Sequence, residues 1–260
     1  MKKIIYSMIA ALTATAINAQ TVKVYKGVEA DGVTPKLAFE LADADSVVFS
    51  QNDAKAVTKG AATTKTGATQ TWTQLWADGP RFADFNLGST VTTYDNAANY
   101  DAPTVGGLYC WGGRVDSRDD FNDDSRASGD GQLSGTDDTA IRLWGENWRM
   151  PTKDELQGMI DNCDWTWCDG TTTQYSAGCK LAGYKVSGKG DYAQNSVFIP
   201  AAGYTDEEGT FYVKKNGFVW SSDARNTSGA YWLSTSKTVK RIDGGSRNYA
   251  YSVRAVCVAK

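Results

Sequence analysis

The side chains that usually carry out acid–base and nucleophilic chemistry are unevenly represented in this chain of 260 residues. It has no histidine, but it has 30 aspartate and glutamate residues, five cysteines and 13 tyrosines. The lack of histidine excludes Ser-His-Asp and Cys-His nucleophile systems, histidine-ligated zinc and the commonest general base at neutral pH. Catalysis would have to use carboxylates, lysine, tyrosine or cysteine. The sequence therefore favours binding, and we assign no catalytic residue.

Eight aspartates gather in one acidic insert, residues 116–138: Asp116, Asp119, Asp120, Asp123, Asp124, Asp130, Asp137 and Asp138. Oxygen-rich loops can bind calcium, but an EF-hand needs a glutamate at its twelfth position, and this spacing does not match. A solvated insert is the simpler interpretation, so we predict no cofactor and keep calcium as the alternative. Glycoside hydrolysis needs two carboxylates in a cleft, one of them with a raised pKa. The sequence does not pair the available candidates, Glu146, Asp154, Glu155 and Asp223.

The five cysteines are Cys110, Cys163, Cys168, Cys179 and Cys257. Cys168 and Cys179 flank a polar, turn-rich loop, and we predict a disulfide there, worth about 3 kcal/mol in the chain-entropy model. Cys163 continues the apolar face of a predicted helix and is expected to be a buried thiol. Cys110 and Cys257 lie in apolar, strand-like runs and could pair or both belong to the core. No cysteines have the spacing of a four-thiolate zinc site, so we predict no metal site.

Residues 220–251 have the composition of a recognition surface, with rigid aromatic side chains among small polar ones. The ligand-binding residues we predict are Asp223, Arg225, Asn226, Trp232, Arg247, Asn248 and Tyr249. The alternative is that Trp220, Trp232 and Tyr251 are strand residues of the core.

Short apolar runs between glycine-rich turns predict the strands that would position these residues. They are residues 106–112, 195–200, 209–213, 217–221, 229–234 and 249–258. One helix is predicted after Pro151, because Thr152 and Glu155 form a capping box. Leu156, Met159, Ile160 and Cys163 would lie on its apolar face.

The N-terminal region divides into three parts. Residues 1–19 read as a signal peptide, with two lysines, a short apolar stretch and a small residue at the cleavage site. Residues 20–50 contain three strand candidates, at 21–26, 36–40 and 46–50, and form a small β element. Residues 51–71 are rich in Thr, Ala, Gly and Lys and are predicted to be a flexible linker. Residues 72–260 hold all nine tryptophans and form the main domain.

Composition limits the partners. Hydrophobic residues make up 41% and charged residues 22%, which indicates a folded chain. Removal of the signal takes away two of 27 basic residues, so the mature net charge is 25 − 30 = −5. The basic residues are scattered, so we expect no nucleic-acid partner. We also expect no membrane-spanning segment in the mature chain.

The order of several segments is more specific than any one of them. The run Trp148 to Glu155 (WRMPTKDE) follows residues 107–111 (GLYCW) and precedes 198–204 (FIPAAGY), 217–222 (GFVWSS) and 251–257 (YSVRAVC). Together they resemble the Fibrobacter succinogenes major paralogous domain family of exported proteins, over about residues 75–260. That family is related to the sulfatase-modifying formylglycine-generating enzymes and has a C-type-lectin-like fold. The resemblance implies an α+β, C-type-lectin-like domain with few helices, short antiparallel strands and long loops, after the small β element.

The functional residues of these relatives do not carry over. Formylglycine-generating enzymes place copper on a pair of cysteines near the C-terminus, where this chain has only Cys257. The Glu-Pro-Asn, Gln-Pro-Asp and Trp-Asn-Asp tripeptides of calcium-dependent lectins do not occur. In some relatives of the fold, the region corresponding to 220–251 is diversified by a reverse-transcriptase system to make new binding sites.

We therefore expect an exported, non-enzymatic recognition or adhesion protein, located in the periplasm, on the outer cell surface or outside the cell. It would bind a protein or glycan at the cell surface through the loop-rich C-terminal face of the domain. The alternative is a structural or accessory subunit of a surface assembly, whose N-terminal strands add to the sheet of a partner. A carbohydrate-active enzyme is the least expected reading.

Overall fold

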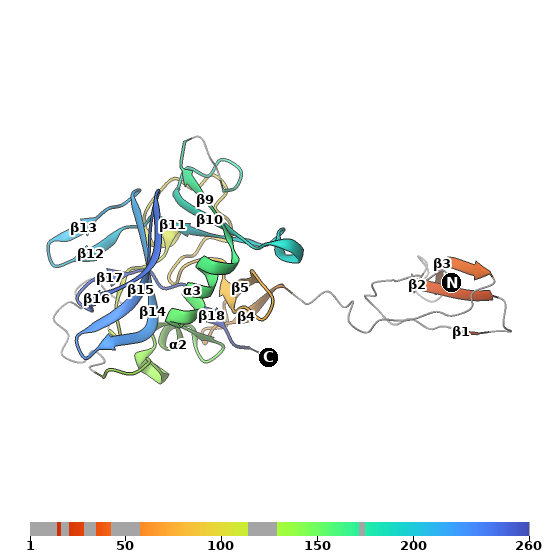
Figure 1. Cartoon of the computed structure of the whole chain (residues 1–260), viewed down its shortest axis with the longest axis horizontal. Helices are drawn as coiled ribbons and strands as arrows, with labels where there is room; N and C mark the ends of the chain where they lie inside the picture. Colours follow the sequence, from red (N-terminus) through yellow and green to blue (C-terminus); the bar gives the residue numbers. More distant parts are fainter. Residues whose placement is uncertain are drawn as a thin grey trace. The chain divides into compact units, whose positions relative to one another are not determined.

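The computed structural model describes the backbone of residues 15–16, 21–28 and 35–42, and then residues 58–113, 129–171 and 175–259 (Figure 1). The chain divides into two compact units, residues 1–57 and 58–260.

The first unit contains a small antiparallel sheet. Its strands are β1 (Thr15–Ala16), β2 (Thr21–Val28) and β3 (Pro35–Ala42), in the order β1-β2-β3. The predicted strands at 21–26 and 36–40 are confirmed, while the one at 46–50 lies outside the described residues. β1 lies within the predicted signal peptide, so cleavage at Ala19 would leave β2 and β3 as a hairpin.

The second unit starts earlier than the sequence suggested. The linker was predicted to run from 51 to 71, but β4 (Lys59–Thr63) and β5 (Thr69–Gln74) form a hairpin inside this unit. The prediction was wrong from residue 58 onward because small residues such as Gly60 pack closely here. A Cβ atom at Gly60 would lie 2.5 Å from the indole of Trp72. Residues 51–57 lie outside the described part.

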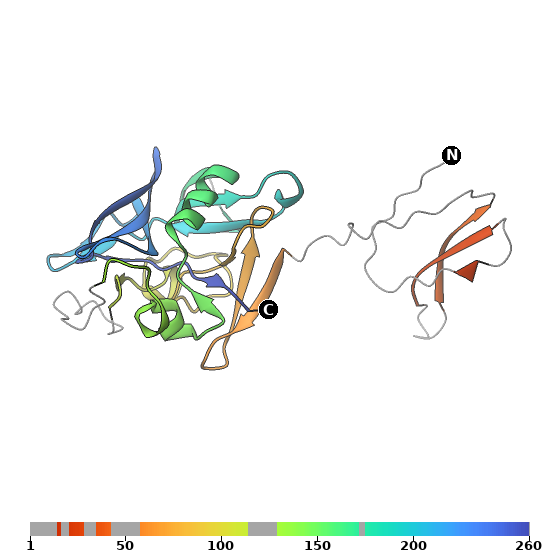
Figure 2. The same ribbon diagram turned by 60° about the horizontal axis from the view of Figure 1, so that its bottom comes forward.

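The rest of unit 2 is mostly antiparallel sheet with few helices, as predicted, an arrangement consistent with an α+β or a mainly β class. A five-stranded sheet has the order β4-β5-β6-β18-β8, with β6 (Arg81–Ala83), β8 (Trp148–Arg149) and β18 (Val256–Cys257). Because β18 pairs with β6, the end of the domain lies beside its beginning (Figure 2).

Three smaller sheets complete the unit. The sheet β11-β10-β9 contains β9 (Asp164–Asp169), β10 (Ala182–Ser187) and β11 (Ser196–Pro200). The sheet β13-β12-β17-β7 contains β7 (Tyr109–Cys110), β12 (Tyr204–Asp206), β13 (Gly209–Phe211) and β17 (Ala250–Tyr251). The sheet β14-β15-β16 contains β14 (Asn216–Asn226), β15 (Gly229–Ser236) and β16 (Val239–Ser246).

The helices in the described residues are short. They are α1 (Ala102–Val105), α2 (Thr139–Trp144), α3 (Lys153–Asn162) and the 3-10 turns η3 (Gly135–Asp137) and η4 (Gly190–Tyr192). α3 is the predicted helix, and its capping box between Thr152 and Glu155 is formed. In the described residues, no helix is both long enough and apolar enough to cross a membrane.

Tryptophans fill much of the core. Trp111, Trp148 and Trp220 are almost fully buried and belong to one cluster that also contains Tyr251. A second cluster lies between α3 and the sheets, around Leu156. These three tryptophans therefore serve packing, and the loops rest on an aromatic interior.

Candidate recognition surface

Arg247 is a core residue, which corrects its prediction as a ligand contact. Only 5% of it is exposed, and its guanidinium lies 4.0 Å from the ring centroid of Trp111. It donates hydrogen bonds to the carbonyl oxygens of Gly129 and Asn226, both at 2.6 Å, and of Gly229 at 3.2 Å. Burial lowers the pKa of Arg247 from its usual value. Such a buried guanidinium ties three backbone segments together and is not available to a ligand.

Trp232 also belongs to the core, so its prediction as a ligand-binding residue is wrong. It is 9% exposed and packs edge-on against Trp220, with ring centroids 5.5 Å apart. Tyr251 closes the group, 5.2 Å from Trp232 and 4.3 Å from Trp220. The alternative reading of these three residues as strand core is confirmed.

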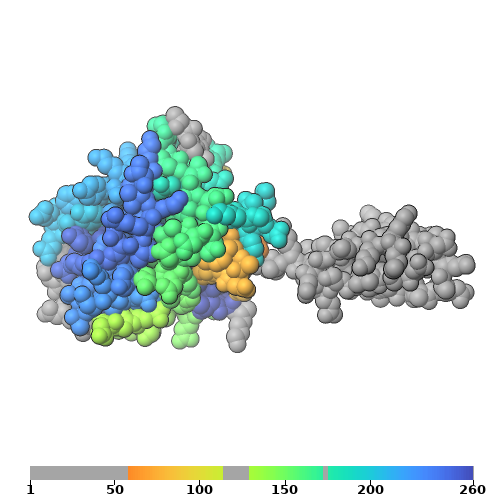
Figure 3. Space-filling view, viewed as in Figure 1, coloured from red at the N-terminus to blue at the C-terminus, as the bar shows by residue number. Residues whose placement is uncertain are grey.

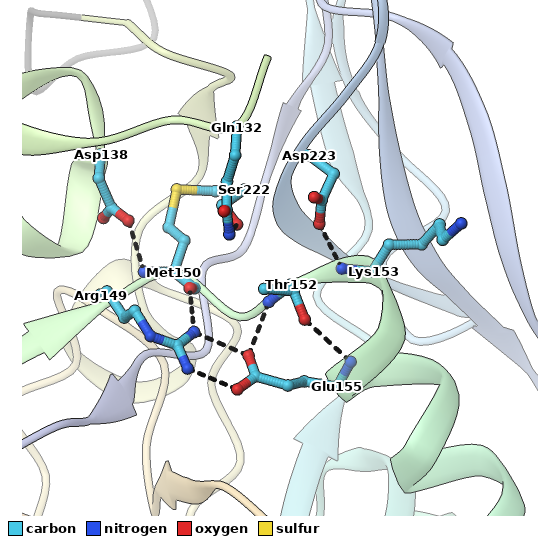
Figure 4. A network of polar contacts seen from close by, with 9 residues as sticks. All are labelled: Gln132, Asp138, Arg149, Met150, Thr152, Lys153, Glu155, Ser222 and Asp223. Atoms are coloured by element: carbon cyan, nitrogen blue, oxygen red, sulfur yellow. Dashed lines mark hydrogen bonds and ion pairs between the residues drawn. The ribbon is translucent and has the colours of Figure 1, made fainter.

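Asp223 is engaged within the protein. Its carboxylate accepts a hydrogen bond from the backbone nitrogen of Lys153 at 2.5 Å (Figure 4). It therefore links β14 to the first turn of α3, where the helix dipole favours an anion.

Three predicted residues lie at the surface. Arg225, Asn226 and Asn248 are exposed, near the ends of β14 and β16. Arg225 donates to the carbonyl oxygen of Gly244 at 2.7 Å, and the side chain of Asn226 accepts from the backbone nitrogen of Ser228 at 3.1 Å. These contacts order the turns, and the structure does not gather the three polar side chains around one point.

Tyr249 belongs to a different grouping, which we call the aromatic shelf: Tyr204, Phe211, Tyr212 and Tyr249. The ring of Tyr204 lies 5.5 Å from Phe211, 5.8 Å from Tyr212 and 5.2 Å from Tyr249, measured between centroids. Tyr204 and Phe211 face each other across the β12–β13 pair, and Tyr249 directly precedes β17. Figure 3 shows the light-blue surface of β12 and β13 next to darker blue atoms, which belong to residues closer to the C-terminus.

The shelf rests on the aromatic core. Tyr249 stacks on Tyr251 with an interplanar angle of 6°, and Tyr251 stacks on Phe218 at 19°. Tyr204 packs edge-on against Phe218, with centroids 5.6 Å apart. The surface rings are therefore held by rings beneath them before any ligand arrives, which lowers the entropic cost of binding.

Tyr212 is the most exposed member, at 55%, and its backbone is unusual. Its φ of 58° lies in the left-handed region, which residues other than glycine rarely adopt. Its carbonyl oxygen accepts from the backbone nitrogens of Lys215 at 3.0 Å and Asn216 at 2.9 Å. The turn thus holds an apolar ring in solvent at a conformational cost, a combination that points to function.

Charged residues border the shelf on two sides. The β12–β13 turn contains Asp206, Glu207 and Glu208. Partial burial raises the pKa of Tyr204, and the charges of Asp206 and Glu208 raise it further, which places these carboxylates near the shelf.

On the other side, Asp243 pairs with Arg241 at 2.8 Å. Asp243 lies opposite Trp232 in the β15–β16 register, and its charge contributes to the raised pKa of Tyr251. The ion pair therefore borders the rings that support the shelf.

The WRMPT segment, in contrast, builds structure. Both terminal nitrogens of the Arg149 guanidinium donate to the carboxylate of Glu155, at 2.5 and 2.7 Å (Figure 4). These bonds raise the pKa of Arg149. Glu155 also accepts from the backbone nitrogen of Thr152 at 2.8 Å. These contacts occupy Glu155, one of the four carboxylates available to the enzyme alternative.

Asp138, from the acidic insert, joins the start of α2 to the WRMPT segment. It is 1% exposed, and its carboxylate accepts from the backbone nitrogens of Ala140, Ile141 and Met150. Burial raises its pKa, which these hydrogen bonds partly offset. Residues 116–128 of the insert lie outside the described part. Among the described residues, no group of three or more His, Cys, Asp or Glu side chains could hold a metal ion.

The predicted disulfide between Cys168 and Cys179 is not formed in this structure, which contains all five cysteines as buried, free thiols. Both residues nevertheless belong to one hydrophobic cluster, around Tyr94 and Phe198. The prediction that Cys163 is a buried thiol is confirmed.

Cys110 and Cys257 lie in different sheets, on β7 and β18. Both are buried thiols, so the alternative that they belong to the core fits the structure.

Two hollows lie outside the shelf. A cavity of about 350 Å³ behind β13 is lined by residues that include Tyr100, Gly107, Thr210 and Val213. A more open groove of about 460 Å³ lies beside α3 and contains Trp76, Arg81, Arg149, Asp154 and Glu155. Neither contains a member of the shelf.

Sequence reasoning missed three of the four shelf residues, Tyr204, Phe211 and Tyr212. A signal existed, because the turn DEEG after Tyr204 brings that residue opposite Phe211 in a hairpin. The proximity of this hairpin to Tyr249 is a long-range contact that no local pattern encodes.

Comparison of the chain with protein-family models, with curated proteins and with solved structures found no match.

Proposed function

We propose that this chain is an exported, non-enzymatic recognition or adhesion protein that binds a ligand on the aromatic shelf. The observation that carries the proposal is Tyr212, an exposed aromatic ring held in a left-handed backbone conformation beside Tyr204, whose ring also contacts Phe211 and Tyr249. Rigid aromatic side chains give large contact areas at low entropic cost, which is why they dominate recognition surfaces. The shelf replaces the polar face that the sequence suggested.

The proposal includes export through the signal peptide and a C-type-lectin-like arrangement of the second unit. Pairing of β18, the last strand, with β6 near the start of the unit supports that arrangement, because such a domain brings strands from its N-terminal and C-terminal parts side by side. Engagement of Glu155 by Arg149 and the helix cap, and of Asp223 by the backbone nitrogen of Lys153, leaves fewer carboxylates for a carbohydrate-active enzyme.

The test uses the mature chain on an array that carries both glycans and purified exported proteins. Tyr212→Gly removes the ring at a position where glycine is conformationally favoured, so the fold should keep its stability. We expect binding to fall with Tyr212→Gly and to persist with Tyr231→Ala. Tyr231 is a matched control because it lies opposite Gly244 and next to Lys153, on the face of β15 away from Trp232. Equal binding by the wild type and Tyr212→Gly would contradict the proposed site.

The alternative function, a subunit of a surface assembly, is favoured by the small sheet of the first unit. Among the described strands, β3 pairs with β2 alone, and cleavage at Ala19 would free the other edge of β2. An isolated two-stranded hairpin is barely stable and can gain a strand from a partner. Loss of assembly on deletion of residues 20–50, with shelf variants unaffected, would support this alternative.

A further inference from the structure

We infer, on the basis of the proposed recognition function, that the ligand of the shelf is an uncharged, extended polysaccharide. Its sugar rings would stack on Tyr212 and on its neighbours Tyr204, Phe211 and Tyr249. The inference rests on the shape of the shelf, its hydrogen-bonding groups and its charge.

The shape favours a ligand with a flat face. The shelf lies outside both hollows described above, and its outermost ring, Tyr212, is 55% exposed. Small-molecule sites usually enclose most of their ligand, and this surface encloses none. A pyranose ring presents a flat face of C–H groups, and a chain of such rings repeats that face over neighbouring aromatic rings.

The hydrogen-bonding groups favour hydroxyls. The hydroxyls of Tyr204, Tyr212 and Tyr249 take part in no hydrogen bond among the described residues. A phenol both donates and accepts, as a sugar hydroxyl does. Three phenols around apolar rings therefore match a ligand whose flat faces are apolar and whose edges carry hydroxyls.

The charge around the shelf favours an uncharged ligand. The acids Asp206, Glu207 and Glu208 lie on one side, the basic pair Lys214 and Lys215 follows Tyr212, and the ion pair beside β16 is neutral. The net charge of these residues is 2 − 3 = −1, and a surface with so small a charge attracts neither a polyanion nor a polycation strongly.

A folded protein partner fits less well. A standard protein interface covers about 800 Å² on each partner and places its strongest contacts in desolvated pockets. Among the large hydrophobic residues of the described part, only Tyr212 and Val258 are exposed. The four rings are thus a small area that suits a narrow chain of sugars.

The experiment measures depletion of the mature chain from solution by insoluble cellulose, chitin and xylan, with alginate gel as a polyanionic comparison. We expect binding to at least one uncharged polymer and none to alginate. Tyr212→Gly and Tyr249→Ala should each weaken it about tenfold, and Tyr231→Ala should not. Binding should also stay constant between about 0.05 M and about 0.5 M salt, because no charge is neutralised.

The outcomes separate the two proposals. Failure to bind any uncharged polymer, or preference for alginate with a steep fall in salt, would overturn the saccharide inference. If the array then identifies a protein ligand whose binding is abolished by Tyr212→Gly, the recognition function stands and only the saccharide inference fails. Polysaccharide binding that is unchanged in both shelf variants would overturn both proposals.

Discussion

Arg225 and Arg247 lie in the same polar segment, yet their guanidinium groups are in opposite environments. Arg225 is exposed and makes one hydrogen bond to a backbone carbonyl, whereas Arg247 is buried against Trp111 and donates to three. Composition could identify a segment rich in arginine, tyrosine and tryptophan. It could not tell which side chains point inward, because that depends on strand register across distant parts of the chain.

Replacement of Arg247 should therefore affect the stability of the fold, whereas replacement of Arg225 should not. We expect Arg247→Ala to lower the free energy of unfolding by about 3 kcal/mol, because buried carbonyl groups lose their donor and Trp111 loses its packing partner. Arg225→Ala should change it by less than about 1 kcal/mol. Urea denaturation of the two variants provides the measurement. Equal small losses would show that Arg247 is not part of the core.

The cysteines give a prediction about thiol reactivity. Burial raises the pKa of Cys163 to about 12, so at pH 8 about one thiol in ten thousand is ionised. Since the thiolate is the reactive form, iodoacetamide at pH 8 should leave Cys163 unmodified in the folded protein. Labelling of Cys163 should rise as pH approaches 12 or when urea exposes it, as followed by peptide mass spectrometry. Rapid native labelling at pH 8 would contradict its burial.

The disulfide prediction can be tested on the same material. In a protein recovered from an oxidising compartment, Cys168 and Cys179 should become linked, because they already share one hydrophobic cluster. Labelling in urea should then modify three of the five cysteines before reduction and all five after it. Five labels before reduction would show that the bridge does not form.

At the scale of elements, local sequence patterns predicted the helix and the strands that local interactions determine. The capping box of α3 and most strands with strong apolar runs, such as β11, β14 and β15, were found from the sequence. The hairpin β4–β5 was missed because it contains small residues that match a linker, and only contact with Trp72 gives them a packed partner. β12 was missed because its three residues, Tyr204–Asp206, form no apolar run.

The cap of α3 is the element whose local stability can be measured most directly. Thr152→Ala should lower the free energy of unfolding by about 1 kcal/mol, because the backbone nitrogen of Glu155 loses its acceptor. Thr152→Ser keeps the hydroxyl and should restore most of that loss. A stability equal to the wild type in Thr152→Ala would mean that the bond between Arg149 and Glu155 alone fixes the helix start.

At the scale of the whole molecule, the boundary between the units decides where the chain can be cut without unfolding. The second unit begins at Thr58, and its first hairpin is tied to distant parts of the unit. The backbone nitrogen of Lys65 donates to the carbonyl oxygen of Trp144 at 2.7 Å, and the side-chain amide of Asn147 donates to the carbonyl oxygen of Thr63 at 3.1 Å. Removal of residues 58–71 would break these bonds and expose the indole of Trp72.

Limited trypsin digestion of the mature protein should therefore cleave after Lys55 and leave the bonds after Lys59 and Lys65 intact, because cleavage needs locally unfolded backbone. A chain that starts at Thr58 should unfold at nearly the same urea concentration as the full mature protein. A chain that starts at Trp72 should be less stable by about 2 to 4 kcal/mol, since Trp72 loses the packing of Gly60 and β5 loses its partner strand. If both chains unfold at the same midpoint, residues 58–71 contribute no stability and act as the linker that their composition suggested.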